Sequence, residues 1–164
     1  HSGPGALTKN LLWETIAVDR FSGRVFRHVT AKIAESIELA LQRLRPAQLE
    51  HMTFAAEGLQ SNRSNHPGVF DPNVHVLAAK DPKGIPLGAM VNFGVHATYY
   101  GAGNLKLSAD VAGAIERSLA TSLKDRTGAS DPVVLFVNGA EGDVTPTKPG
   151  DLAFYGNLFA EQTM

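Results

Sequence analysis

Apolar residues recur at helical spacing early in the chain. Between residues 21 and 44 they fall at steps of three and four, which places them on one helical face: Val25, Val29, Ile33, Ile37, Leu41 and Leu44. Arg43 and Arg45 suit the negative pole of a helix dipole, and Pro46 predicts the end of the element. The pattern therefore predicts an amphipathic helix from about residue 21 to residue 44.

A second helix is predicted from about residue 109 to residue 123. Its apolar side chains recur every four residues, at Val111, Ile115 and Leu119, and Ser108 is placed to cap its first turn. The final stretch, "DLAFYGNLFAEQTM", also has a helical pattern. We expect both segments to pack against a sheet.

Alternating and β-branched runs predict the strands of that sheet. Residues 49–58 alternate in part, and residues 74–81 and 85–96 flank the turn "PKG", which is typical of a hairpin. The second hairpin strand is almost wholly apolar, which predicts burial of both its faces. The run "PVVLFV" at 132–137 has the pattern of a central strand, and the polar stretch at 60–73 that of a loop. The fold class is therefore α/β, a mixed β-sheet flanked by helices.

Composition narrows the functional classes. A chain of 164 residues with 43% hydrophobic and 19% charged residues is long enough for one globular domain with a core. Its net charge of −1 gives no reason to expect nucleic acid as a partner. The apolar runs are too short for a membrane span. Because the chain has no Cys, any metal must bind His or oxygen ligands.

Polar residues directly after apolar strands are the candidates for chemistry, since functional groups of open α/β sheets gather in those loops. His96 ends an apolar strand, where a rigidly held imidazole suits zinc, although a hydrogen-bonded structural histidine fits the same position. The other histidines have no partner at ligand spacing and are interpreted as structural: His28, His51, His66 and His75.

Two loops offer further groups. In "NGAEGDVTP", the side chains of Glu141, Asp143 and Thr145 stand among glycines whose N–H groups can face a ligand, or they make only local backbone bonds. Arg63 in "SNRSN" has the forked donors that pair with an oxyanion, or it is a solvated loop arginine.

The order of several motifs along the chain resembles one family. "HSGPG", the long first helix, "NRS", "NFGVHAT", "LSADVAG" and "VLFVNGAEGDVTP" are together similar to the N-terminal catalytic domain of neutral/alkaline, non-lysosomal ceramidases. The resemblance implies that residues 1–164 are a single, incomplete catalytic domain of that kind. It also implies a zinc-dependent amidohydrolase that cleaves the N-acyl bond of ceramide to sphingosine and fatty acid.

The resemblance assigns roles to individual residues. His96 matches a zinc ligand of the family, and His1 and Arg63 match active-site residues. Asp143 matches a catalytic aspartate, whereas Thr145 stands where the family has serine in "GDVSP". A first zinc histidine is expected two positions ahead of His1, and a glutamate and a tyrosine ligand in a later part of the domain.

The resemblance also has implications for the substrate and the cellular location, and two alternative functions stand beside it. It implies a lipid amide substrate, peripheral membrane contact through that substrate, and a secreted or periplasmic protein. Thr145 motivates two alternatives: a zinc amidohydrolase of a different N-acyl substrate, and a family member that has lost catalysis and serves binding or structure.

Overall fold

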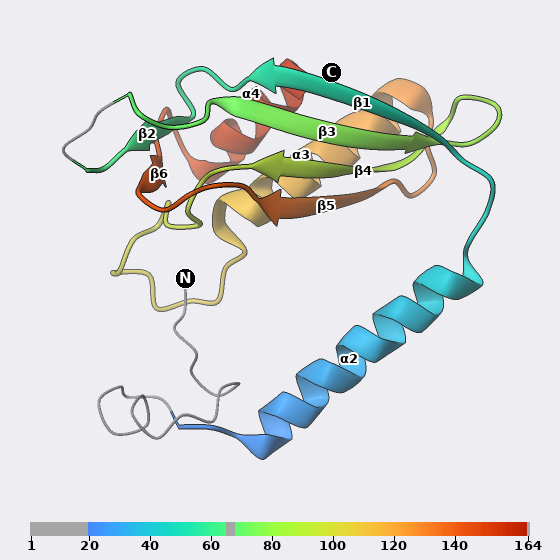
Figure 1. Ribbon diagram of the computed structural model, residues 1–164, viewed down its shortest axis with the longest axis horizontal. Coiled ribbons are helices and arrows are strands. Elements are labelled where there is room, and N and C mark those ends of the chain that lie inside the picture. The colour runs from blue at the N-terminus through green and yellow to red at the C-terminus, as the bar shows by residue number, and fades with distance from the viewer. Residues whose placement is uncertain (1–19, 65–67, 164) are drawn as a thin grey trace. The chain divides into compact units, whose positions relative to one another are not determined.

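The computed structural model describes residues 20–64 and 68–163. The chain divides into two compact units at Arg45 and Pro46, and each unit is described by itself. In the first unit, helix α2 (Gly23–Gln42) confirms the predicted amphipathic helix (Figure 1). The Ser22 side chain accepts a hydrogen bond from the backbone N–H of Val25 and caps the helix.

The second unit is built on a four-stranded mixed sheet. Its strand order is β1-β3-β4-β5, in which β1, β3 and β4 pair antiparallel and β5 runs parallel to β4. A separate two-stranded ribbon pairs β2 with β6. The elements are β1 (Gln48–Ala55), β2 (Gln60–Asn62), β3 (Asn73–Lys80), β4 (Pro86–Phe93), α3 (Asp110–Thr127), β5 (Val133–Asn138), β6 (Val144–Pro146) and α4 (Leu152–Thr163). The α/β class is therefore confirmed, with the predicted hairpin as β3 and β4.

Helices α3 and α4 cover one face of this sheet (Figure 1). The core between them contains fully buried side chains from both layers: Val74, Val91, Phe93, Ile115, Leu119, Tyr155 and Phe159. The Phe159 ring lies 6.0 Å from the ring of Phe54 and 5.5 Å from that of Phe93. Apolar burial of this kind is the main stabilising term of a small domain.

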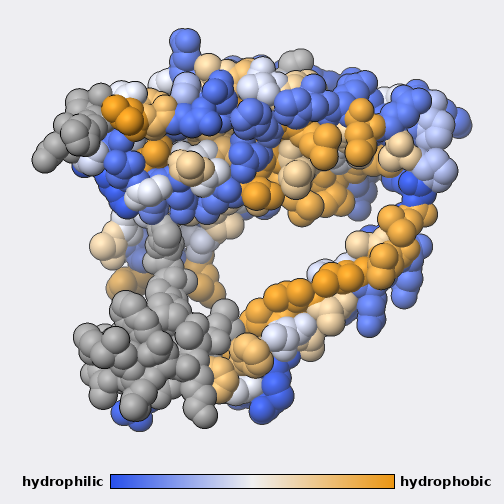
Figure 2. All heavy atoms as spheres, in the orientation of Figure 1, coloured by the Kyte–Doolittle hydropathy of each residue, from blue (hydrophilic) through white to orange (hydrophobic). Residues whose placement is uncertain are grey.

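Strand β5 differs from its prediction as a central strand. It lies at the edge of the sheet described here, where the Phe136 backbone N–H donates to the Glu116 carboxylate of α3 at 2.9 Å. Leu135 is 55% exposed, and Met90 of β4 is 41% exposed on the same face. The prediction that β4 is buried on both faces is therefore wrong within the second unit, because α3 and α4 cover only the other face. Figure 2 shows apolar side chains on the side of the sheet opposite these helices.

Two local predictions also need correction. The predicted loop at 60–73 begins with β2, whose partner β6 is remote in sequence. Ser108 does not cap α3 as an N-cap residue, because the helix begins after Ala109. The Ser108 hydroxyl instead accepts a hydrogen bond from the Asp110 N–H at 3.0 Å. Among the described residues, no helix is long and apolar enough to cross a membrane.

The core predicts a large cost for truncating Phe159. Phe159→Ala is expected to lower the free energy of unfolding by about 3 to 5 kcal/mol, because the lost ring leaves a cavity between α4 and the sheet. Phe154→Ala is the matched control on the same helix, since Phe154 is 47% exposed. Urea denaturation measures both variants. Equal losses for the two would contradict the packing described.

Candidate functional site

The β2–β6 ribbon brings two distant motifs together. Ser61 pairs with Thr145 and Asn62 with Val144, and the Arg63 N–H donates to the Asp143 carbonyl at 2.8 Å. The backbone pairing therefore places "NRS" directly beside "GDVTP".

His96 lies against the same ribbon. It follows β4, is 7% exposed, and makes two hydrogen bonds to one acceptor: its backbone N–H and its ring Nδ1 both donate to the Val144 carbonyl, at 3.2 and 2.9 Å. A carbonyl oxygen cannot donate, so Nδ1 carries the proton. In the neutral form of the ring, the lone pair then lies at Nε2.

The Arg63 guanidinium faces this lone pair. Its Nη2 lies 3.3 Å from His96 Nε2 and 3.4 Å from the Gly142 carbonyl. Arginine only donates, so its approach agrees with an unprotonated Nε2. Arg63 thus joins the imidazole to the "GDVTP" loop.

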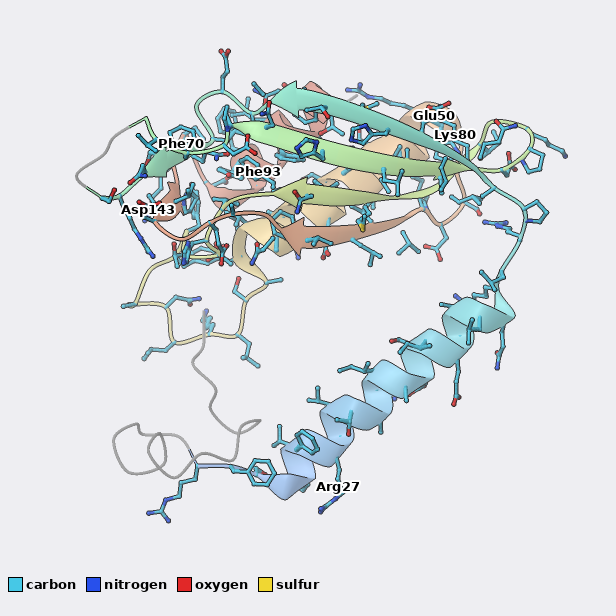
Figure 3. The ribbon with its side chains drawn as sticks, in the orientation of Figure 1. Arg27, Glu50, Phe70, Lys80, Phe93 and Asp143 are labelled. Atoms are coloured by element: carbon cyan, nitrogen blue, oxygen red, sulfur yellow. The ribbon has the colours of Figure 1, made fainter. Side chains whose placement is uncertain are left out.

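Asp143 is held as a carboxylate. Asn62 Nδ2 donates to its Oδ2 at 3.0 Å, while Asn62 Oδ1 accepts from the Ser64 backbone N–H at 2.7 Å. Hydrogen bonds from the side chains of Ser64 and Asn62, together with the charge of Arg63, hold the pKa of the Asp143 carboxyl below its usual value. Asp143 lies beyond the end of the sheet, past Phe93 (Figure 3).

Two glycines allow the loops after β4 and β5 to approach each other. The Gly139 N–H donates to the Phe93 carbonyl at 3.0 Å. A Cβ added at Gly94 would lie 2.7 Å from the Ala140 carbonyl oxygen. A side chain at Gly94 would therefore force the "GDVTP" loop away from His96.

The structure brings together three of the five predicted site residues: Arg63, His96 and Asp143. Thr145 is on the same ribbon, half-buried opposite Ser61, one residue beyond Val144. His1 lies outside the described residues. Asn62 and Ser64 were missed as functional residues, although they flank Arg63 in the tripeptide that drew attention to it.

Zinc binds proteins through Cys, His, Asp and Glu side chains. Across residues 20–64 and 68–163, no three His, Cys, Asp or Glu side chains gather as a metal site. His96 nevertheless has two features of a zinc ligand: it is buried, and it is oriented through the ring nitrogen that would not bind the metal. The described residues thus supply one fitting ligand.

Comparison with known proteins gives the family. Residues 1–154 match the family described as neutral/alkaline non-lysosomal ceramidase, N-terminal. The chain belongs to this family. Against the neutral ceramidase of Pseudomonas aeruginosa it is 27% identical over 168 aligned residues, covering 94% of this chain and 24% of that protein. The chain therefore spans about a quarter of the length of this ceramidase.

Solved ceramidase structures have the same fold. The crystal structure of the P. aeruginosa neutral ceramidase matches with a TM-score of 0.82 at 25% identity, over 99% of this chain and 29% of that one. A structure described as ceramidase complexed with C2 matches with a TM-score of 0.74 at 24% identity, over 87% and 25% of the two chains. The mixed sheet and its two helices are thus part of a known ceramidase architecture.

The Asn62 contact predicts a measurable shift at Asp143. Removal of this donor in Asn62→Ala is expected to raise the pKa of Asp143 toward about 3.9, the unperturbed value. With its lowered pKa, the native carboxylate stays charged at neutral pH and becomes protonated only well into the acid range. A ¹³C NMR titration of the Asp143 carboxyl measures the change.

The control is Asn104→Ala, since the Asn104 side chain bonds Lys106 in its own loop. It is expected to leave the Asp143 titration unchanged. An unchanged or lower pKa in Asn62→Ala would contradict the role given to Asn62.

Proposed function

We propose that this chain carries part of the active site of a zinc-dependent amidohydrolase. The proposed reaction is hydrolysis of the N-acyl bond of ceramide-like sphingolipids to sphingosine and a fatty acid. The observation that carries the proposal is the orientation of His96, whose Nδ1 is fixed on the Val144 carbonyl while Nε2 faces the Arg63 guanidinium. Membership of the ceramidase family supports the choice of an amide substrate.

His96 would hold the metal through Nε2, with further ligands outside the described residues. When bound, zinc supplies Lewis acidity that polarises an amide carbonyl and favours deprotonation of water. For His96 to bind the metal, the Arg63 guanidinium must turn from Nε2, which its contacts allow because both are single, long hydrogen bonds of 3.3 and 3.4 Å.

Arg63 has the chemistry to stabilise the transition state. Amide hydrolysis adds a water oxygen to the carbonyl carbon and places negative charge on the carbonyl oxygen before the C–N bond breaks. A guanidinium beside that oxygen would offset this charge. Asp143 is ionised and hydrogen-bonded to Asn62 and Ser64, and it would orient the ribbon. It would also accept a proton from the attacking water, and this proton would finally pass to the leaving amine.

Thr145 keeps the hydroxyl that the "GDVSP" serine would provide. Thr145 lies in β6, two residues after Asp143, which stands in the turn just before the strand. We infer that its hydroxyl orients the water or the substrate amide, and that its extra methyl leaves less room for them than the serine would.

The proposed setting follows the substrate. A sphingolipid is delivered from a membrane, so we propose peripheral membrane contact through the substrate and a secreted or periplasmic enzyme. The similar neutral ceramidase of P. aeruginosa comes from a bacterium.

The metal ligand is tested by His96→Ala in the full-length protein. Its zinc affinity is expected to fall more than about 100-fold, because outer-shell contacts of zinc ligands alone are worth 10–100-fold. Metal content and hydrolysis of a short-chain fluorescent N-acyl-sphingosine are measured with and without chelator. His28→Ala on α2 is the control and should retain both. Stoichiometric zinc in His96→Ala would show that His96 is not a zinc ligand. Wild-type protein that binds zinc but hydrolyses no N-acyl substrate would refute the proposed amidohydrolase activity.

The Thr145 hydroxyl is tested by a matched pair of variants. Thr145→Val keeps the branched shape but removes the hydroxyl, and is expected to lower kcat about 100-fold, within the range of positioned proton-transfer groups. Thr145→Ser keeps the hydroxyl and should retain wild-type kcat or exceed it. Steady-state kinetics on the same substrate measure both. Equal kcat for Thr145→Val and wild type would place the hydroxyl outside the reaction. Turnover of other amides but not of ceramide would select the alternative substrate.

A further inference from the structure

One motif of the sequence has no part in the chemistry proposed above. In "LSADVAG", Asp110 begins helix α3 with only 7% of its surface exposed and with φ at +49°. Residues with side chains rarely adopt positive φ, and a buried carboxylate is costly unless hydrogen bonds satisfy it. Both features call for a physical explanation.

The Asp110 carboxylate accepts three backbone N–H groups. Its Oδ1 accepts from Tyr99 and Val111, both at 2.8 Å, and its Oδ2 accepts from Tyr100 at 3.2 Å. Only Val111 belongs to its own helix. A residue that merely started the helix would direct its side chain to the first turn, whereas this one bonds mainly to the loop that follows His96.

The loop from His96 to Tyr100 is thus fastened at both ends. At its start, the His96 N–H and Nδ1 hold the Val144 carbonyl. At its end, Tyr99 and Tyr100 hold the Asp110 carboxylate. Between these anchors, the Thr98 N–H donates to the His96 carbonyl at 2.8 Å, which makes the segment a tight turn.

The end anchor is itself buried and braced. The Tyr99 hydroxyl donates to the Gly150 carbonyl, and its ring lies 6.0 Å from that of Tyr155. Burial, with the Asp110 charge as a smaller cause, raises the pKa of the Tyr155 phenol above its usual range, so its hydroxyl stays protonated and donates to the Leu59 carbonyl at 2.8 Å. These contacts of Tyr99 and Tyr155 therefore join the His96 loop to the core.

We propose that Asp110 is a positioning residue for the active site: its carboxylate fixes the Tyr99–Tyr100 backbone and thereby the orientation of the His96 imidazole. The inference rests on the proposed function, because the orientation matters for a metal ligand. Asp110 itself would touch neither substrate nor metal. Its effect passes through the backbone of a turn only three residues long between His96 and Tyr100.

Two substitutions separate the carboxylate from the backbone conformation. Asp110→Asn keeps the size and the tolerance for positive φ, but its amide nitrogen replaces one acceptor. Asp110→Gly allows positive φ freely and removes all acceptors. Leu119→Ala is the control: Leu119 is 1% exposed on the same helix, so its truncation destabilises α3 without removing a bond to the His96 loop.

The test uses the full-length protein loaded with Co²⁺, whose d–d absorption reports ligand geometry, and Zn²⁺ affinity by competition with a chelator. Both Asp110 variants are expected to alter the Co²⁺ spectrum and to weaken Zn²⁺ binding about tenfold or more, in the range of outer-shell losses. Leu119→Ala should lower thermal stability and leave the spectrum unchanged. Should Asp110→Gly fail to fold, Asp110→Asn decides.

The outcomes separate the two hypotheses. Wild-type spectra and affinities in Asp110→Asn would overturn the positioning role while leaving the zinc site intact. An altered spectrum in Leu119→Ala equal to that of the Asp110 variants would also overturn it, because loss of stability alone would then explain the change. A wild-type protein that takes up neither Co²⁺ nor Zn²⁺ would overturn the proposed function itself, and the inference with it.

Discussion

The Val144 carbonyl is the group on which the site depends. It accepts hydrogen bonds from the backbone and from the ring of His96, at 3.2 and 2.9 Å, and so fixes the position and the tautomer of that imidazole together. Because Val144 pairs with Asn62 in the ribbon, the same short element also sets the places of Arg63 and Asp143. A single backbone oxygen thus links the end of β4 to two loops that are far apart in sequence.

The rest of the second unit keeps the end of β4 and these two loops in place. The sheet and helices bury the Phe93 end of β4, and Gly94 leaves room for the loop after β5 to approach. Stability in the core therefore has a functional use, because a site built from loops needs rigid elements beneath it. The charge pattern agrees: Arg63 and the ionised Asp143 lie at the ribbon, whereas the core cluster of the second unit is apolar.

The two long helices and the hairpin were predictable because each has a local sequence pattern. Helical spacing indicated residues 21–44 and 109–123, and the "PKG" turn indicated the hairpin of β3 and β4. The edge position of β5 could not be predicted, since an apolar run does not specify which strands lie beside it. The ribbon of β2 and β6 could not be predicted either, because strands of three residues are too short to show a period and their pairing partners are remote in sequence.

The site was predicted residue by residue from family resemblance, and its contacts came only from the fold. No spacing rule places Arg63 beside His96, or Asn62 beside Asp143, because those contacts arise from long-range pairing. Asp110 was hidden for the same reason: its partners at Tyr99 and Tyr100 precede it by ten residues or more in a loop without periodicity.

We propose that His96 binds a zinc ion through Nε2, and not through Nδ1. Anomalous diffraction at the zinc edge, from crystals of the full-length protein grown with zinc, tests it most directly. We expect a peak about 2.0–2.1 Å from His96 Nε2, with Nδ1 still hydrogen-bonded to the Val144 carbonyl. A peak bonded to Nδ1, or zinc bound elsewhere with His96 unliganded, would contradict it.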